Sequence, residues 1–181
     1  MTKIVTILTE GFADWETSLL NAVAHAYYKV ETMYATPGGR PVTSDMAIED
    51  VKPDVYVAVV VCGGTAWKSD NPPDVSVLMR ATRDKGVLLG LICDATWAAS
   101  KAGLLDEVRH TSNGAGYLDG TGYKGSALYR DTPAAVSDHR IVTAAGTSPV
   151  AFMTAVLEEL GLANDDLSYY VGLHAAQYKA A

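Results

Sequence analysis

The sequence predicts an α/β protein with a mostly parallel sheet that is covered by helices on both faces. Short apolar runs alternate along the chain with longer segments of helical periodicity. Two of the runs, VYVAVVVC (55–62) and VLLGLIC (87–93), are almost continuously apolar, which is typical of strands buried on both faces. Strands that alternate with helices form right-handed βαβ units, and such units build a parallel sheet.

The first expected element is a strand at KIVTIL (3–8). The segment DWETSLLNAVAHAYY (14–28) has the apolar spacing of an amphipathic helix, and Asp14 is its expected N-cap. KVETMYAT (29–36) returns as a strand, which Pro-Gly-Gly then turns. The apolar face of the helix is expected to consist of Leu19, Leu20, Val23 and Tyr27.

The second half of the chain continues the alternation. PPDVSVLMRATRDKG (72–86) predicts a helix with proline in its first turn and glycine after its end. The strand at 87–93 leads directly into a helix over 94–105, and a polar, glycine-rich segment follows at 111–126. The last expected elements are short strands in ALYR (127–130), AAVSD (134–138) and RIVTAAG (140–146), a helix over 148–161 and a short C-terminal helix.

Composition limits the classes of function. A chain of 181 residues, 49% of them hydrophobic, fits a single domain over 1–181 with a full core. No apolar run is long enough to span a membrane, and the N-terminus begins as a strand without a signal-peptide pattern. The net charge of −7 argues against a nucleic-acid partner. Two cysteines form no disulfide framework, so we expect a cytoplasmic protein with free thiols.

Cys93 lies where a buried strand is expected to turn at once into a helix. Such a corner exposes its residue at the rim of the sheet, often with a strained backbone, as in a nucleophile elbow. The amides at the start of the following helix favour a thiolate, so the pattern predicts a lowered pKa for this thiol. The alternative interpretation is a small buried hydrophobic residue, which is the usual place of a free cysteine.

Two further segments reach the same edge of the predicted sheet. Glu16 follows the first strand, and as a protonated acid it could donate a hydrogen bond to the Cys93 thiolate; alternatively it only complements a helix dipole. Gly63 and Gly64 follow the strand at 55–62, and their amides are candidate oxyanion donors or simply parts of a tight turn.

Taken together, these features resemble the ThiJ/PfpI superfamily of glutamine-amidotransferase-like proteins and intracellular protease/amidase relatives. The matching segments are ILTEGFADWET (7–17), VVVCGG (59–64), GLICDATWAASKAGLL (90–105) and IVTAAGTSPVAFMTAVLEELG (141–161). The resemblance implies a flavodoxin-like three-layer sandwich and a homodimer. It also implies that Cys93 is the elbow cysteine, Glu16 the carboxylate that contacts it, and Gly64 with the amide of Asp94 the oxyanion region.

The chain departs from the family pattern where a histidine is expected. Protease-like members carry histidine directly after the cysteine, whereas this chain has Asp94, which could act as a base, orient a water molecule or cap the helix. His110 is the nearest other candidate, and a packing or solvated role is expected for it. Asn113 and Tyr117 in the polar segment are candidate substrate contacts, or parts of a plain glycine-rich loop, and Trp97 either walls the site or packs in the core.

Two functions follow from these residues. The first is a cysteine-dependent enzyme for a small molecule, of the hydrolase, amidase, hydratase or lyase type, with Cys93 as nucleophile and Glu16 as its proton partner. The second is a redox-sensing or stress-response protein in which Cys93 is oxidised, with Cys62 as a conceivable resolving thiol. An amidotransferase subunit is disfavoured, since no His–Glu pair is found late in the chain. No motif for a cofactor or a metal is present, so none is expected.

Overall fold

The structure is a computed structural model that describes residues 2–39 and 45–179. Seven strands form one sheet in the order β3-β2-β1-β4-β5-β7-β6. Neighbouring strands pair in parallel, except that β6 pairs antiparallel with β7. The strands are β1 (Lys3–Ile7), β2 (Glu31–Thr36), β3 (Met46–Ala47), β4 (Ala58–Val61), β5 (Leu88–Ile92), β6 (Val136–Asp138) and β7 (Ile141–Ala144).

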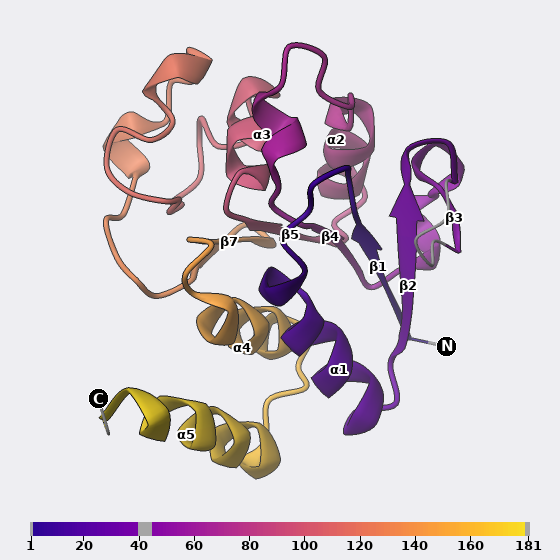
Figure 1. Ribbon diagram of the computed structural model, residues 1–181, viewed down its shortest axis with the longest axis vertical. Helices are drawn as coiled ribbons and strands as arrows, with labels where there is room; N and C mark the ends of the chain where they lie inside the picture. Colours follow the sequence, from indigo (N-terminus) through magenta and orange to yellow (C-terminus); the bar gives the residue numbers. More distant parts are fainter. Residues whose placement is uncertain (1, 40–44, 180–181) are drawn as a thin grey trace.

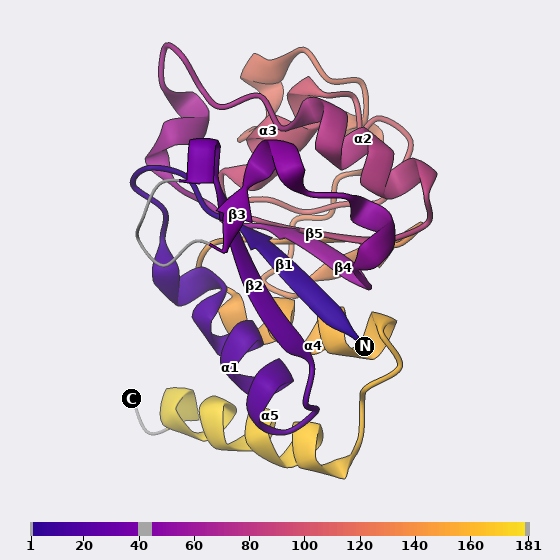
Figure 2. The same ribbon diagram turned by 90° about the vertical axis from the view of Figure 1, so that its right-hand side faces the viewer.

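The sheet is the middle of three layers (Figure 1). One side is covered by α2 (Ser76–Asp84) and α3 (Ala95–Lys101), and the other by α1 (Ser18–Ala26) and α4 (Pro149–Glu159). Outside this second layer lies α5 (Asp165–Lys179), which Figure 2 shows running beneath α1 and α4. Each layer buries its own hydrophobic cluster against the sheet, one around Trp67 and Met79 and the other around Leu20 and Phe152. The predicted flavodoxin-like sandwich is therefore confirmed.

The sheet's central strands place the functional residues. β1, β4 and β5 are fully or almost fully buried, and their parallel pairing brings their carboxyl ends to one edge. Strand order reverses between β1 and β4, because the chain passes from β1 to β2 over one face of the sheet and from β4 to β5 over the other face. Ligands of open parallel sheets bind at the carboxyl edge near such a reversal.

Three local predictions differ from the structure. The segment 14–28 is divided into a 3-10 turn at Asp14–Glu16 and α1, so Asp14 lies within the turn and is not the helix N-cap. α2 begins at Ser76, so the two prolines precede the helix and do not lie in its first turn. The Asp74 carboxylate accepts a hydrogen bond from the Ser76 amide at this start. ALYR (127–130) forms a 3-10 turn and one isolated bridge instead of a strand.

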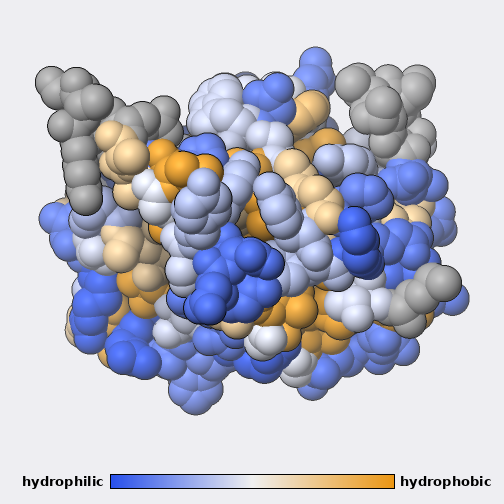
Figure 3. Space-filling model, turned by 90° about the horizontal axis from the view of Figure 1, so that it is seen from below, coloured by the Kyte–Doolittle hydropathy of each residue, from blue (hydrophilic) through white to orange (hydrophobic). Residues whose placement is uncertain are grey.

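The outer surface near α5 is mixed in character. Figure 3 shows hydrophobic residues scattered among hydrophilic ones on the face seen from below. Tyr169 and Leu173 of α5 are among the exposed large apolar side chains. Within the described residues, none of the helices combines the length and the apolar character that crossing a bilayer demands.

Candidate functional site

Cys93 lies at the corner between β5 and α3, in the left-handed region of backbone space, with φ of 57°. A side chain in this region costs about 1–2 kcal/mol, so the surrounding structure must impose the conformation. The Cys93 amide donates to Ala144 O at the end of β7 (3.0 Å), and the Thr96 hydroxyl donates to Cys93 O (2.6 Å). The predicted elbow is therefore present, and its sulfur is only partly buried.

Glu16 lies in the 3-10 turn after β1 and is almost completely buried, at 1% exposure. Its Oε2 accepts a hydrogen bond from the Gly63 amide (2.8 Å), and its carboxyl is hydrogen-bonded to Cys93. Gly146 closes the third side: a Cβ atom there would lie 2.8 Å from both Cys93 Sγ and Glu16 Oε1. The structure thus brings together the carboxyl group and the thiol that the sequence pairs by their places at one edge of the predicted sheet and by family resemblance.

The protonation of this pair differs from the prediction. Burial raises the pKa of the Glu16 carboxyl. Burial also raises the pKa of the Cys93 thiol to about 12, with further raising contributions from the carboxylates of Glu16 and Asp94. The predicted lowered pKa is therefore wrong, because desolvation outweighs the hydrogen bonds to the sulfur. Cys93 is therefore a thiol at neutral pH.

Asn113 connects the polar segment to the sulfur. Its Nδ2 donates to Cys93 Sγ (3.3 Å), which lowers the pKa of the thiol in part, and its Oδ1 accepts from the Gly146 amide (2.9 Å). The side chain is exposed, so it lies on the open side of the sulfur. Asn113 therefore contacts Cys93 directly in this structure, whereas the sequence indicated a substrate contact or a plain glycine-rich loop.

The two glycines after β4 have different roles. The Gly63 amide is engaged by Glu16, so it holds the carboxyl group and is not a free oxyanion donor here. A Cβ at Gly63 would also lie 2.6 Å from Cys93 Cβ. At Gly64 a Cβ would lie 2.9 Å from Gly11 O and Phe12 Cα, so this position needs glycine to let two loops pass closely. The amides of Gly64 and Asp94 stay predicted oxyanion donors.

Asp94 and three neighbours form a second polar group beside the elbow. The Tyr117 hydroxyl donates to Asp94 Oδ1, and Lys68 Nζ lies 3.6 Å from the same oxygen. The ammonium of Lys68 also lies over two aromatic rings, 3.7 Å from the Tyr117 centroid and 4.4 Å from that of Trp97. Trp97 is half-buried at the wall of this group, one of the two positions expected for it.

Two other candidates are structural. His110 is fully buried, with Nδ1 at 2.8 Å from Val108 O and its ring packed edge-on against Tyr123 and Tyr129. Burial lowers its pKa, so it is a neutral packing residue, as expected. Cys62 is also fully buried: its thiol donates to Ala13 O (3.2 Å), and burial raises its pKa to about 12.

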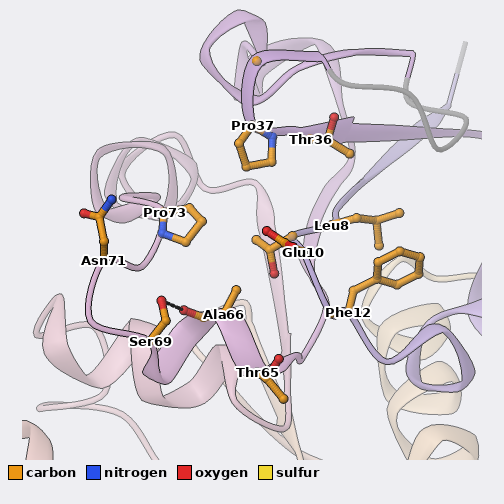
Figure 4. A pocket seen from close by; sticks show the side chains of 13 residues that line it. Leu8, Glu10, Phe12, Thr36, Pro37, Thr65, Ala66, Ser69, Asn71 and Pro73 are labelled. Carbon is orange, nitrogen blue, oxygen red and sulfur yellow. Dashed lines mark hydrogen bonds between the residues drawn. The ribbon is translucent and has the colours of Figure 1, made fainter.

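A broad cleft of about 1030 Å³ lies along the same sheet edge (Figure 4). It is formed by the segments that follow three strands: Leu8–Phe12 after β1, Thr36–Gly38 after β2 and Thr65–Pro73 after β4. Neither Cys93 nor Glu16 lines it, so it is separate from the candidate pair. We locate the site by its chemistry, at the elbow. Among the described residues there is no group of three or more side chains suited to hold a metal ion.

A family model described as the DJ-1/PfpI family matches residues 2–159. The chain belongs to the DJ-1/PfpI family. The solved structure of the DJ-1 superfamily protein Atu0886 from Agrobacterium tumefaciens superimposes with a TM-score of 0.95 at 37% identity, covering 98% of this chain and all of the other. This family membership confirms the resemblance noted in the sequence.

Two DJ-1/PfpI relatives from Bacillus subtilis are described as uncharacterized proteases. YoaZ is 27% identical over 97% of this chain and 91% of its own length. YdeA is 30% identical over 87% of this chain and 83% of its own length. The family assignment therefore rests on nearly the full chain, whereas the reaction has to be argued from the residues around Cys93.

Proposed function

We propose that this DJ-1/PfpI protein is a cysteine-dependent enzyme for a small molecule, with Cys93 as nucleophile and Glu16 as its proton partner. The observation that carries the proposal is the contact of the partly exposed thiol with a buried carboxyl group at a strained corner. The substrate is a compound with an electrophilic carbon, such as an amide or ester, and the reaction uses no cofactor. By family resemblance, the active form is a homodimer.

The raised pKa values indicate which group takes the thiol proton during the reaction. Cys93 is a thiol at neutral pH, so attack on the substrate carbon requires a base, and the Glu16 carboxylate is hydrogen-bonded to the sulfur. As the C–S bond forms, the thiol proton passes to Glu16, which then returns it to the leaving nitrogen or oxygen. Glu16 is thus the acid and the base for the sulfur, and burial holds it ready to be protonated.

The second candidate is a redox sensor in which Cys93 is oxidised. This function depends on a resting thiolate, because the thiolate is the species that peroxide oxidises. A pKa of about 12 leaves few thiolates at neutral pH. The enzyme is therefore the better supported function. Glu16 can take the thiol proton while Cys93 attacks a substrate, whereas a sensor depends on a thiolate that is already present at rest.

The charges near the sulfur favour uncharged or cationic substrates. The carboxylates of Glu16 and Asp94 both raise the pKa of the Cys93 thiol, so they disfavour negative charge there, and the ammonium of Lys68 is already paired with Asp94. Neutral amides and esters are expected to react faster than analogues that carry a carboxylate next to the reacting carbon.

The test compares the two cysteines of the chain. Wild type, Cys93→Ser and Cys62→Ala are screened for turnover of neutral amides and esters, and quenched samples are examined by intact-protein mass spectrometry for a covalent adduct. We expect turnover and adduct in wild type and Cys62→Ala, and a loss of roughly 10³-fold or more in Cys93→Ser. Selective peroxide oxidation of Cys93 without Cys93-dependent turnover would favour the sensor instead.

A further inference from the structure

The side chain of Asp94 is not used by the helix that it precedes. Asp94 occupies the N-cap position of α3 with helical backbone angles (φ −63°, ψ −15°), and its carboxylate makes no capping hydrogen bond. An N-cap aspartate ordinarily accepts from the second or third amide of its helix. Of the roles open to Asp94 from the sequence, capping is therefore excluded in this structure, and the carboxylate is directed elsewhere.

Side chains from two other segments of the chain hold that carboxylate in place. Tyr117 comes from the polar segment, Lys68 from the turn after β4, and Asp94 from the corner after β5. Tyr117 and Lys68 both contact Oδ1, and the Lys68 ammonium is itself fixed over two aromatic rings. The start of α3 does not require these contacts, because an N-cap aspartate needs no tyrosine or lysine from distant parts of the chain.

This group is connected to the sulfur. Tyr117 is hydrogen-bonded to Asn113 as well as to Asp94, and Asn113 donates to Cys93 Sγ at 3.3 Å. Asp94 also interacts electrostatically with both members of the reactive pair, since its charge raises the pKa of Cys93 and of Glu16. A chain of hydrogen bonds through Tyr117 and Asn113 therefore joins the Asp94 carboxylate to the sulfur.

The two carboxylates differ in their access to water. Glu16 is 1% exposed and is enclosed by Gly63, Cys93 and Gly146, so a water molecule cannot approach it from solvent. The side chain of Asp94 is 16% exposed, and Tyr117 links it to the exposed Asn113. A cysteine enzyme that forms an acyl intermediate needs a base for the thiol and then a base for water, and one residue can serve both steps only where it can reach both the sulfur and the water. The buried carboxylate suits the first task and the partly exposed one suits the second.

We propose that Asp94 is the base that activates water for release of the substrate from Cys93, and that Tyr117 and Lys68 position it. This role rests on the proposed function. His110, the nearest histidine, is sealed in the core and cannot take this role.

The step balances as follows for an acyl group on Cys93. The oxygen of water forms a bond to the carbonyl carbon while its proton passes to Asp94. The C–S bond then breaks, its electron pair returns to sulfur, and the resulting thiolate takes up a proton from bulk water, because Glu16 has already given the thiol proton to the leaving group. The products are a carboxylic acid and the Cys93 thiol, and Asp94 loses its proton to bulk water.

The experiment uses p-nitrophenyl acetate as the probe and follows both the burst of p-nitrophenol and acetyl-Cys93 by intact mass. Asp94→Asn should keep the burst, accumulate acetyl-Cys93 and slow the steady-state rate roughly 10²-fold, the lower end of the effect of a general base. The matched control is Asp138→Asn, because Asp138 is also ion-paired and equally buried, at 17% exposure, but lies at β6 beside Arg109. It should behave as wild type.

Azide separates a catalytic role from a structural one. Azide attacks the acyl group without a base, and as an anion it is repelled by the Asp94 carboxylate, so it should release acetyl-Cys93 from Asp94→Asn at least as fast as from wild type. Equal adduct lifetimes in Asp94→Asn and wild type, or a slow azide reaction in the variant, would overturn the role of Asp94 alone. Absence of acetyl-Cys93 in wild type would overturn the proposed function and this role together.

Discussion

The two cysteines of this protein end neighbouring strands of one sheet, and burial raises the pKa of each thiol to about 12. They differ in backbone and surroundings. Cys62 follows β4 and is fully buried, with its thiol donating to Ala13 O. Cys93 is partly exposed, has a positive φ and contacts a carboxyl group and an amide. Glu16 lies beside both thiols, since Cys62 Sγ is 4.0 Å from Glu16 Oε2, so the difference teaches that backbone strain and access, and not acidity, distinguish Cys93.

The largest expected effect tests whether the base must touch the sulfur. In Gly146→Ala the new Cβ would lie 2.8 Å from both Cys93 Sγ and Glu16 Oε1, so the two groups must separate. We expect a loss of roughly 10²-fold in turnover, the typical cost of misplacing a reacting group by about 1 Å. The control is Gly172→Ala in α5, where a Cβ meets nothing within 4 Å and the backbone is helical. Unchanged turnover in Gly146→Ala would show that the contact is dispensable.

The second prediction concerns access and acidity. Alkylation of native protein by iodoacetamide should modify Cys93 and spare Cys62, because only Cys93 is partly exposed. With a pKa of about 12, the labelling rate should rise about tenfold per pH unit from pH 7 to 9 and not level off. Peptide mass spectrometry assigns the label. A plateau below pH 8 would mean that the thiolate forms far more easily than burial allows.

The third prediction uses glycine to compare the two backbones. Cys93→Gly should raise the free energy of unfolding by about 1 kcal/mol, because glycine adopts a φ of 57° without strain. Cys62→Gly should lower it by about 2–3 kcal/mol, since it opens a cavity and deletes buried hydrogen bonds. Denaturant unfolding measures both. A destabilising Cys93→Gly would mean that the sulfur contacts outweigh the strain.

The smallest effect concerns the carboxyl group between the thiols. Because burial raises the pKa of Glu16, the charged form is costly in the folded state and stability is lost as the pH rises through that pKa. Glu16→Gln removes this cost, so the melting temperature at pH 7 should rise by about 2–4 °C, the shift for about 1 kcal/mol in a chain of this size. The gain should vanish below about pH 4, where wild type is protonated too. A gain that persists at low pH would point to packing instead.

The sequence predicted what depends on local pattern. The apolar runs at 55–62 and 87–93 located two central strands, and the abrupt change to helical spacing located the elbow at Cys93. The pairing with Glu16 came from its position after the first strand and from family resemblance. The placement of Glu16 on the first helix was wrong, because the turn at Asp14–Glu16 stops before α1. The residue types do not indicate this break between the turn and α1, because the apolar spacing continues regularly across it.

The rest depends on contacts between distant segments. The sequence could not show that Tyr117 and Lys68 meet at Asp94, because these residues lie on three segments joined only by the folded chain. It also gave the wrong direction for the pKa of Cys93. Local pattern supplied the amides near the sulfur, whereas the degree of burial that outweighs them is a property of the packed layers.

The elbow at residue 93 is held from outside the side chain, by Ala144 O on the backbone amide and by the Thr96 hydroxyl on the carbonyl. The sulfur contributes nothing to either bond. The backbone of residue 93 therefore sets the direction of its side chain whatever atom that side chain carries. Selenocysteine or a non-natural nucleophile at this position would keep the same orientation and the same neighbours, the Glu16 carboxyl group and the Asn113 amide.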